Sequence, residues 1–177
     1  MHIPEPVQKI MDRLESHGFS SWLAGGCVRD SLMGKEPHDY DIASQARPEQ
    51  VMGLFDHVIP TGIAHGTVTV IEDGMTVEVT TLRREGSYED HRHPDAVEFV
   101  SSIEEHLARR DFTINAMAWN PKTGLTDPFC GQKDLKDGII RAVGSPDERF
   151  EEDALRMMRA FRFAGRLGFQ IEESTRQ

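Results

Sequence analysis

Residues 23–42 constrain this chain more than any other stretch, because a glycine pair, Gly25-Gly26, is closely followed by two aspartates. Residues 21–24 predict a short strand, and the glycine pair allows a tight turn with no Cβ in the way. Residues 28–33 predict a short helix that Gly34 closes. A glycine pair that opens a helix presents N–H groups and the positive end of the helix dipole, which suits a phosphate.

The two aspartates are Asp39 and Asp41, in a second predicted strand over residues 39–43. Side chains in a strand alternate between faces, so two carboxylates that are two residues apart point the same way. Such a pair is costly unless a cation joins it, and hard oxygen ligands of this kind suit Mg²⁺. The aspartates therefore predict a metal site beside the predicted phosphate site.

Each half of this pattern has a simpler interpretation. A glycine pair before a helix is usually only a turn, and an Asp-x-Asp pair is more often a solvated strand end. Their close succession is much rarer and favours metal-assisted chemistry on a nucleoside triphosphate.

Composition limits the remaining choices. A chain of 177 residues can form one domain with a core and the start of a second. A net charge of −10 and a sequence pI of about 5.2 argue against a general nucleic-acid binder, which contacts phosphates through Lys and Arg. Arginines nevertheless crowd the second half and could form a local basic groove, although each alone could be solvated surface charge: Arg83, Arg84, Arg92, Arg109, Arg110, Arg156, Arg159 and Arg162.

Two cysteines without metal-ligand spacing predict a reduced cytoplasmic protein. No apolar run approaches the length of a membrane span, so we expect no membrane partner.

Periodicity and turn signals predict the other elements. Asp73-Gly74 marks a hairpin turn, and residues 83–94 predict a loop. Helices are predicted over residues 6–17, from Pro48, from Ser102, before Asp137 and from Ser145, and strands at the end of 61–71 and over 75–82, 97–100, 117–120, 125–127 and 139–143. Glu78 lies on the polar face of the strand over residues 75–82; there it could be solvated, or lie beside Asp39 and Asp41.

Residues 109–116 form a second polar motif, Arg-Arg-Asp-Phe-Thr-Ile-Asn-Ala. Two cations, a carboxylate and an amide among apolar residues could bind a triphosphate and a ribose. They could equally form a salt-bridged surface.

The predicted last helix has two opposite faces. Its apolar arc is Ala154, Met157, Met158, Phe161 and Ala164, and its basic arc is Arg156, Arg159, Arg162 and Arg166. A basic helical face is usually solvated.

Three segments together resemble one family: GG-x-V-R-D followed by D-x-D, R-R-D-x-x-x-N-A at residues 109–116, and E-D-x-x-R-x-x-R at residues 152–159. They resemble the polymerase-β-like nucleotidyltransferases, and most closely the class II tRNA nucleotidyltransferase (CCA-adding) and bacterial poly(A) polymerase family. The resemblance implies an α/β (α+β) fold, in which a head with a mixed sheet flanked by helices covers residues 1–143. Residues 144–177 would begin an all-α neck, and the family's further C-terminal regions would be absent.

The resemblance also implies residue roles. Asp39 and Asp41 would bind catalytic Mg²⁺, with Glu78 as a third catalytic carboxylate. Asp111 would contact the ribose, Arg110 and Asn115 the phosphates, and Asp153 with Arg156 would read the base. The full implied nucleotide-binding set is Gly25, Gly26, Arg29, Arg110, Asp111, Asn115, Asp153, Arg156 and Arg159.

The expected function is template-independent nucleotidyl transfer from CTP and ATP to the 3′ end of tRNA. Two alternatives stay open: a poly(A) polymerase acting on RNA 3′ ends, and a non-catalytic nucleotide- or RNA-binding fragment. Without further neck regions, Met157, Met158 and Phe161 would need cover from the head or from a second chain in a homodimer. We then expect weakened base selectivity and weak tRNA affinity.

Overall fold

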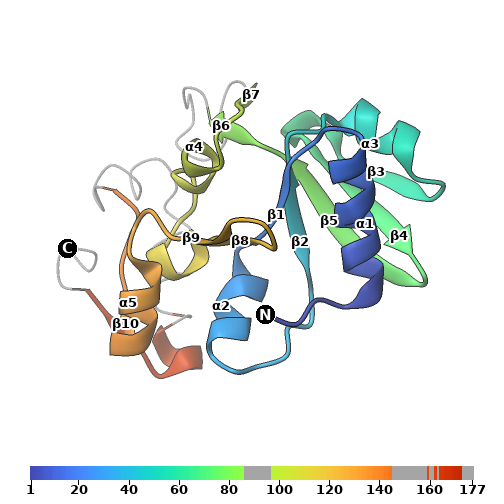
Figure 1. Ribbon diagram of the computed structural model, residues 1–177. Helices are drawn as coiled ribbons and strands as arrows, with labels where there is room; N and C mark the ends of the chain where they lie inside the picture. The colour runs from blue at the N-terminus through green and yellow to red at the C-terminus, as the bar shows by residue number, and fades with distance from the viewer. Residues whose placement is uncertain (86–96, 145–158, 160–161, 163, 173–177) are drawn as a thin grey trace.

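A seven-stranded sheet organises the structure, a computed structural model that describes residues 1–85, 97–144, 159, 162 and 164–172. The strand order is β3-β4-β5-β2-β1-β8-β9 (Figure 1). Only β2 and β5 are parallel, and all other neighbours are antiparallel. The bounds are β1 Ser21–Ala24, β2 Asp41–Ser44, β3 Val58–Gly62, β4 Thr67–Glu72, β5 Met75–Thr81, β8 Ala118–Asn120 and β9 Gly124–Thr126.

Helices α1 (Glu5–Ser16) and α3 (Pro48–Leu54) cover one face of the sheet (Figure 1). Helix α1 covers the sheet because its apolar residues recur at helical spacing and form one stripe, which is buried. That stripe packs against the inward residues of β4 and β5 in one buried cluster, which includes Val7, Ile10, Met11, Leu14, Val68, Val70, Val77 and Val79.

Helix α2 (Gly26–Leu32) and the second half of the chain build around the other end of the sheet. The second half contributes α4 (Ile103–Leu107), the 3₁₀ turn η2 (Thr113–Asn115), α5 (Gly131–Asp137) and β10 (Ile139–Ile140). Residues 164–167 are helical, and β11 (Gln170–Ile171) then pairs in parallel with β10. This last segment packs on the head through an apolar cluster of Phe112, Ile114 and Ile140 with Leu135, Ala164, Leu167, Phe169 and Ile171.

A small hairpin, β6 (Arg83–Glu85) with β7 (Val97–Phe99), leaves the end of β5. It packs where the chain turns through η1 (Ile63–His65) into β4. Gly66 has a φ of 81°, and a Cβ there would lie 2.9 Å from the Phe99 ring. The Arg47 guanidinium lies over the same Phe99 ring, 5.3 Å from the ring centroid.

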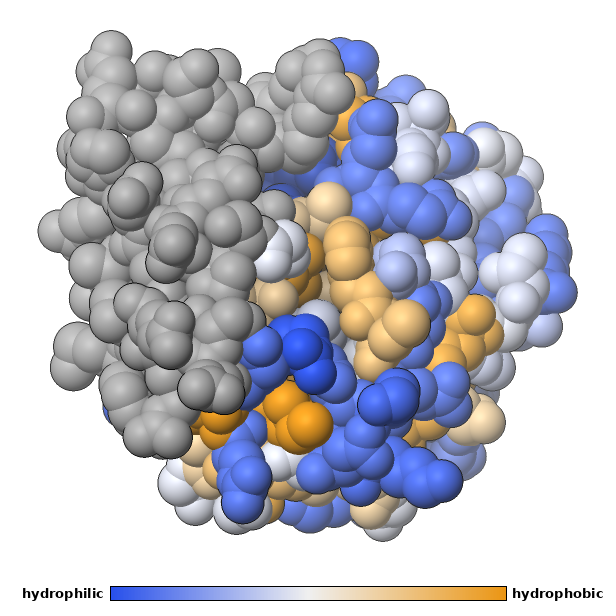
Figure 2. All heavy atoms as spheres, turned by 90° about the vertical axis from the view of Figure 1, so that its left-hand side faces the viewer, coloured by the Kyte–Doolittle hydropathy of each residue, from blue (hydrophilic) through white to orange (hydrophobic). Residues whose placement is uncertain are grey.

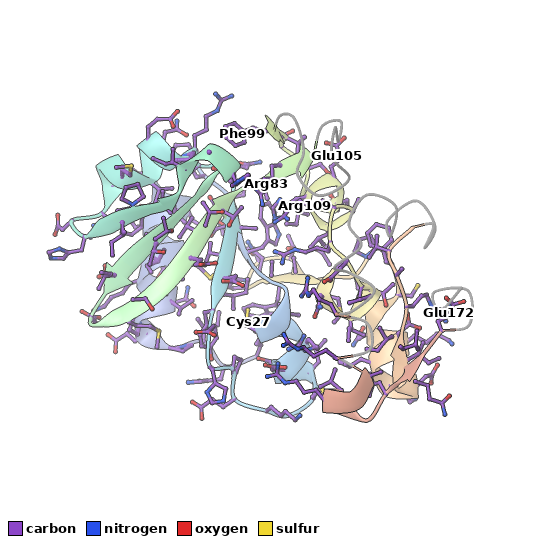
Figure 3. All side chains as sticks on the ribbon, turned by 180° about the vertical axis from the view of Figure 1, so that it is seen from behind. Cys27, Arg83, Phe99, Glu105, Arg109 and Glu172 are labelled. Atoms are coloured by element: carbon purple, nitrogen blue, oxygen red, sulfur yellow. The ribbon has the colours of Figure 1, made fainter. Side chains whose placement is uncertain are left out.

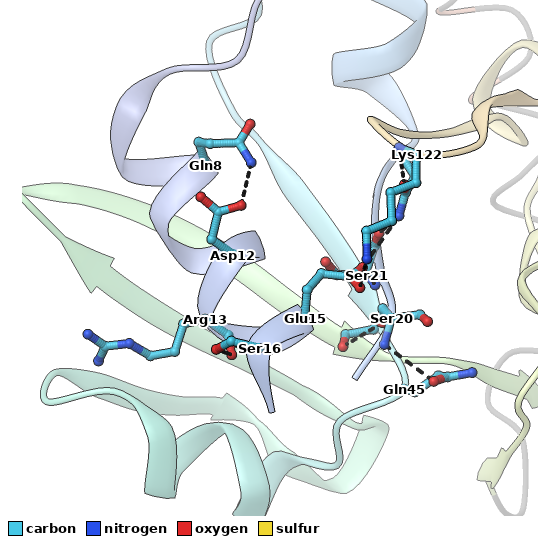
Figure 4. A network of polar contacts seen from close by, with 11 residues as sticks. Gln8, Asp12, Arg13, Glu15, Ser16, Ser20, Ser21, Gln45 and Lys122 are labelled. Atoms are coloured by element: carbon cyan, nitrogen blue, oxygen red, sulfur yellow. Dashed lines mark hydrogen bonds and ion pairs between the residues drawn. The ribbon is translucent and has the colours of Figure 1, made fainter. Parts of the chain in front are cut away.

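A polar network ties α1 to the sheet (Figure 4). The Glu15 carboxylate accepts from the Ser21 backbone N–H at 3.0 Å and pairs with Lys122 at 3.4 Å. The Asn120 amide donates to the Ser21 carbonyl at 2.6 Å. These bonds fix the end of α1 against β1 and the β8–β9 turn.

Among the described residues on the side that carries α5, hydrophobic residues lie in patches among hydrophilic ones (Figure 2). The exposed large hydrophobic residues come from different elements and include Leu32, Met52, Ile59 and Ile63. Among the described helices, none combines the length and apolar character needed to span a membrane.

The structure confirms several local predictions. The strand over residues 21–24 is present, Asp73 and Gly74 have φ values of 49° and 80° in the hairpin turn, and Ser102 caps α4 by accepting from the Glu105 N–H.

Other boundaries differ from the predictions. The strand predicted over residues 39–43 begins only at Asp41, and the helix predicted from Val28 begins at Gly26. The predicted loop over residues 83–94 begins with β6, and the strand predicted over 139–143 ends at Ile140. The strands β3 and β11 were not predicted, because short edge strands are set by a pairing partner rather than by local sequence. Residues 145–158, where the last helix is predicted to begin, lie outside the described residues, so the domain boundary near residue 143 stays a prediction.

Candidate functional site

Two cavities meet at Asp41. The first, the cationic cavity, has a volume of about 280 Å³ and is lined by Gly26, Arg29, Asp41, Arg109, Arg110, Asp111, Asn115 and Arg159. The second, the carboxylate cavity, has a volume of about 350 Å³ and is lined by Asp39, Tyr40, Asp41, Thr69, Thr76 and Glu78. Asp41 is the residue that lines both cavities. A group bound in one cavity can therefore meet a group bound in the other beside this carboxylate.

Strand register brings the acidic residues together. Asp41 in β2 pairs with Glu78 in the parallel neighbour β5, and their side chains lie within hydrogen-bonding reach. Burial, followed by the charges of Glu78 and Asp39, raises the pKa of Asp41 to about 6, against the lowering effect of the Arg110 charge. Asp41 is thus ionised at neutral pH, and the Arg110 charge does not fully balance the negative charges of Asp41, Glu78 and Asp39.

Asp39 reaches the same cavity for a different reason from the predicted one. It precedes β2 and is exposed, so strand alternation does not orient it. The chain between α2 and β2 nevertheless brings it into the lining of the carboxylate cavity beside Asp41 and Glu78.

The donor set suits a divalent cation that also takes substrate oxygens. Among the described residues, no group of three or more His, Cys, Asp or Glu side chains is close enough to hold a metal ion by itself. Mg²⁺ is commonly bound by one or two carboxylates together with water and substrate phosphates rather than by a complete protein cage. Asp39 and Asp41, the latter bordering an arginine-lined cavity, fit this mode of binding.

The glycine pair makes room for arginines. Gly25 has a φ of 80°, and a Cβ there would lie 3.1 Å from Nη1 of Arg110; a Cβ on Gly26 would lie 3.4 Å from Nη2 of Arg29. The Gly25 N–H already donates to the Met117 carbonyl at 3.1 Å. The Gly25 N–H is therefore already used and does not belong to the expected phosphate site of free N–H groups. Gly26 is the glycine of the pair that lines the cationic cavity.

A buried polar network joins the first motif to the second. Nη1 of Arg29 donates to Oδ1 of Asn115 at 2.6 Å, and Nδ2 of Asn115 donates to Oδ1 of Asp111 at 3.3 Å. The other Asp111 oxygen forms an ion pair with Arg159. Arg29 also pairs with Asp30 at 3.0 Å. This network holds the amide and carboxylate that are expected to contact the nucleotide.

Helix α4 carries two further cations into the cationic cavity, because Arg109 and Arg110 follow directly after its end. His106 anchors this helix: its Nδ1 accepts from the Arg83 N–H at 3.0 Å, and its side chain is fully buried. Burial and then the charges of Arg109, Arg110 and Arg83 lower the pKa of His106 to about 2, which keeps the ring neutral. Figure 3 shows Arg83 and Arg109 in this region, between the sheet and α4.

The structure brings most of the predicted site residues together. The predicted residues that line the two adjoining cavities are Gly26, Arg29, Asp39, Asp41, Glu78, Arg110, Asp111, Asn115 and Arg159. Asp153 and Arg156, predicted to read the base, lie outside the described residues.

Sequence reasoning missed three lining residues as site members: Tyr40, Thr69 and Thr76. Arg109, one of the two cations of the second motif, lines the cationic cavity beside Arg110. The threonines alternate with buried valines in β4 and β5, which shows that they share a face but not that this face borders Asp41.

Solved structures with this fold include nucleotidyltransferases with bound substrates. A crystal structure of the Bacillus stearothermophilus CCA-adding enzyme in complex with CTP superposes with a TM-score of 0.88 at 44% identity, covering 98% of this chain and 42% of that one. A tRNA nucleotidyltransferase complexed with a primer tRNA and an incoming ATP analog superposes with a TM-score of 0.72 at 34% identity, covering 94% and 47%.

Sequence comparison agrees with the fold. The CCA-adding enzyme of Ligilactobacillus salivarius is 51% identical over an alignment of 177 positions, which covers 98% of this chain and 44% of the relative, so the chain spans less than half the relative's length. The sequence profile described as "Poly A polymerase head domain" matches residues 21–141, which hold the sheet and nearly all the described lining residues of both cavities. The chain therefore belongs to the poly(A) polymerase head-domain family.

Proposed function

We propose that the chain is the catalytic head of a nucleotidyltransferase that adds nucleotides from CTP and ATP to the 3′ end of tRNA without a template, as in CCA addition or repair. The observation that carries the proposal is the position of Asp41 between an arginine-lined cavity and a carboxylate-lined cavity. The printed names of the relatives and of the substrate complexes support the choice of CTP, ATP and tRNA. We assign the head to residues 1–143 and the start of a neck to residues 144–177.

The cationic cavity would bind the nucleotide. Arg109 and Arg110 supply guanidinium donors that match phosphate oxygens. Asn115, held by Arg29, would contact the phosphates as well, and Asp111 can accept from ribose hydroxyls. Because Arg159 pairs with Asp111, nucleotide binding would make the ribose compete with Arg159 for this carboxylate. Asp153 and Arg156 would select the base.

The carboxylates would promote the transfer itself. Asp39 and Asp41 would hold Mg²⁺, with Glu78 beside them as a third catalytic carboxylate, and the metal would supply stabilisation of charge on the attacking and leaving oxygens. Asp41 lies where a 3′-hydroxyl from one cavity can approach an α-phosphate from the other. Arg109 and Arg110 remain beside the pyrophosphate product and balance its charge.

Substitution of the two aspartates tests the proposal. Asp39→Asn and Asp41→Asn should each lower nucleotide incorporation by about a hundredfold to a thousandfold, because each removes a carboxylate that would hold the Mg²⁺ that stabilises charge in the transition state. The measurement is incorporation of labelled CTP into tRNA that lacks its 3′ terminus. Asp41→Asn should stay folded, since burial and Glu78 already disfavour its charge, and thermal unfolding verifies this. Undiminished incorporation by both variants would contradict the proposal.

The description of the matching family favours a second candidate, a poly(A) polymerase. CTP supplied alone to tRNA lacking its terminus separates the two, because a poly(A) polymerase should add little cytidylate. A third candidate is a nucleotide- or RNA-binding module without turnover. Mg²⁺-dependent release of pyrophosphate during incubation with RNA would exclude it.

A cytoplasmic location and a homodimer through Met157, Met158 and Phe161 belong to the proposal as well. These three residues lie outside the described part of the chain. Farther along the same arc, Ala164 belongs to the cluster on the head, which favours intramolecular cover at that end. Sedimentation at several protein concentrations measures the oligomeric state.

A further inference from the structure

A continuous series of polar contacts leads from the last turn of α2 into the cationic cavity. Its members, the polar relay, are Asp30, Arg29, Asn115 and Asp111. The last three line the cationic cavity, whereas Asp30 is not among the described lining residues of either cavity. Asp30 can therefore act on a bound nucleotide through Arg29.

Asp30 holds the Arg29 guanidinium in one orientation. Oδ1 of Asp30 accepts from Nε of Arg29 at 3.0 Å and lies 3.0 Å from Nη2, so it engages one edge of the group. Because the guanidinium is planar and its donors have fixed directions, engaging this edge also sets the direction of Nη1. Nη1 of Arg29 donates to Oδ1 of Asn115 at 2.6 Å.

The Asn115 amide has one orientation that suits both of its neighbours. An arginine can only donate, so the amide oxygen faces Arg29, and a carboxylate can only accept, so Nδ2 faces Oδ1 of Asp111 at 3.3 Å. Asn115 is buried, and a reversed amide would set donor against donor and acceptor against acceptor, which is costly away from water. The second Nδ2 proton remains for a phosphate oxygen of the nucleotide.

These contacts give the two oxygens of Asp111 different tasks. Oδ1 accepts from Asn115 and, at 2.7 Å, from the Phe112 backbone N–H, so it is bound to the protein. Oδ2 forms the ion pair with Arg159 and is the oxygen that a ribose hydroxyl would engage in its place. The polar relay therefore determines how Oδ2 is directed in the cationic cavity.

We infer that Asp30 is a positioning residue that makes the nucleotide site selective for a ribose over a 2′-deoxyribose. It acts through Arg29 and Asn115 on the direction of the Asp111 carboxylate, which would accept from the 2′-hydroxyl. The inference rests on the proposed function, in which Asp111 contacts the ribose. It adds a residue outside the cavity that sets the selectivity without touching the nucleotide.

Calorimetric titrations with CTP and with 2′-deoxy-CTP test the inference, with Mg²⁺ present and no RNA, so that no transfer occurs. The parent should bind CTP about tenfold more tightly, as expected for one hydrogen bond to a charged acceptor. Asp30→Asn keeps the shape of the side chain but removes its charge, and its NH₂ group cannot accept from Arg29. It should weaken CTP binding by about threefold to tenfold and 2′-deoxy-CTP binding by less than about twofold.

Asp137→Asn is the matched control. Asp137 is the last residue of α5, pairs with Lys133 at 3.1 Å and is not among the described lining residues of either cavity. The same loss of charge there should leave the parent's preference for CTP unchanged. A parent without that preference, or an Asp30→Asn variant that retains it, would overturn the inference. An equal loss of affinity for both nucleotides in Asp30→Asn would overturn it as well, because Asp30 would then support the site as a whole.

The Asn115 side-chain amide gives a readout that needs no nucleotide. In spectra of the ¹⁵N-labelled chain, its signals should move in Asp30→Asn and stay in place in Asp137→Asn. A parent that binds CTP and incorporates cytidylate into tRNA, with Asn115 signals that Asp30→Asn leaves unchanged, would overturn the inference alone. A parent that neither binds CTP nor incorporates cytidylate would contradict the proposed function and the inference with it.

Discussion

Cys130 occupies a backbone conformation that L-residues with a side chain disfavour. It precedes α5 with φ 59° and ψ 38°, in the left-handed region, and its side chain is exposed. This conformation costs a residue with a Cβ roughly 1–2 kcal/mol, and glycine adopts it freely. The backbone angles therefore make Cys130 a site of local strain.

Cys130→Gly should therefore raise the free energy of unfolding by about 0.5–1 kcal/mol, the relief of strain less the greater flexibility of the unfolded chain. Denaturant unfolding under reducing conditions measures it. Cys130→Ala removes the thiol but keeps the strained Cβ, so its stability should match the parent's. Equal stabilisation by both variants would point to the thiol instead.

Helix α5 supports the second polar motif, residues 109–116, by packing against η2. Gly131 begins it, and a Cβ at this position would collide with the backbone carbonyl of Thr113 in η2. The Thr113 hydroxyl donates to the buried Asp134 of α5 at 2.7 Å, and Arg141 donates to the same carboxylate at 3.0 Å. Close packing of α5 on η2 thus fixes the turn that ends at Asn115 in the cationic cavity.

Gly131→Ala should lower the free energy of unfolding by about 2–4 kcal/mol, since the obstacle is rigid backbone and the elements must separate. Gly53→Ala is the matched control: Gly53 is inside α3 with open space where a Cβ would be, so alanine should stabilise by about 0.5–1 kcal/mol. Thermal and denaturant unfolding of both variants measure the effects. A Gly131→Ala variant as stable as the parent would show that α5 does not pack tightly on η2.

At the scale of the whole molecule, buried ionisable groups give the stability a pH dependence that net charge does not predict. The folded state lowers the pKa of His106 to about 2, whereas it raises that of Asp41 to about 6. Below pH 6.5 the unfolded chain protonates His106 and the folded chain does not, so this residue makes stability fall as the pH falls. Asp41 acts in the opposite direction, because the folded chain takes up its proton first.

Comparison with His106→Asn isolates the histidine, since both proteins keep Asp41. Asparagine can still accept the Arg83 N–H but does not titrate. The parent's stability advantage over the variant should shrink by about 2 kcal/mol between pH 6.5 and pH 5.0. Urea unfolding across this range measures it. An advantage that is independent of pH would mean that His106 is protonated in the folded state.

Sequence alone determined the features that arise from neighbours along the chain. The apolar stripe of α1, the Asp73-Gly74 turn and the Ser102 cap depend on residues within a few positions of each other. Alternation along β5 likewise separated Glu78 from the core valines. The motifs around Gly25 and Arg110 identified the residues of the candidate site, although their precise roles stay proposals.

The tertiary structure decided how these local features meet. The register that sets Asp41 beside Glu78 and Thr69, and the bond from Arg29 to Asn115, 86 residues later, depend on which strands and helices pack together. The return of β11 onto β10 has the same origin. Such pairings are selected by the burial of the whole core, to which residues far apart in the chain contribute together, so no short stretch of sequence contains them.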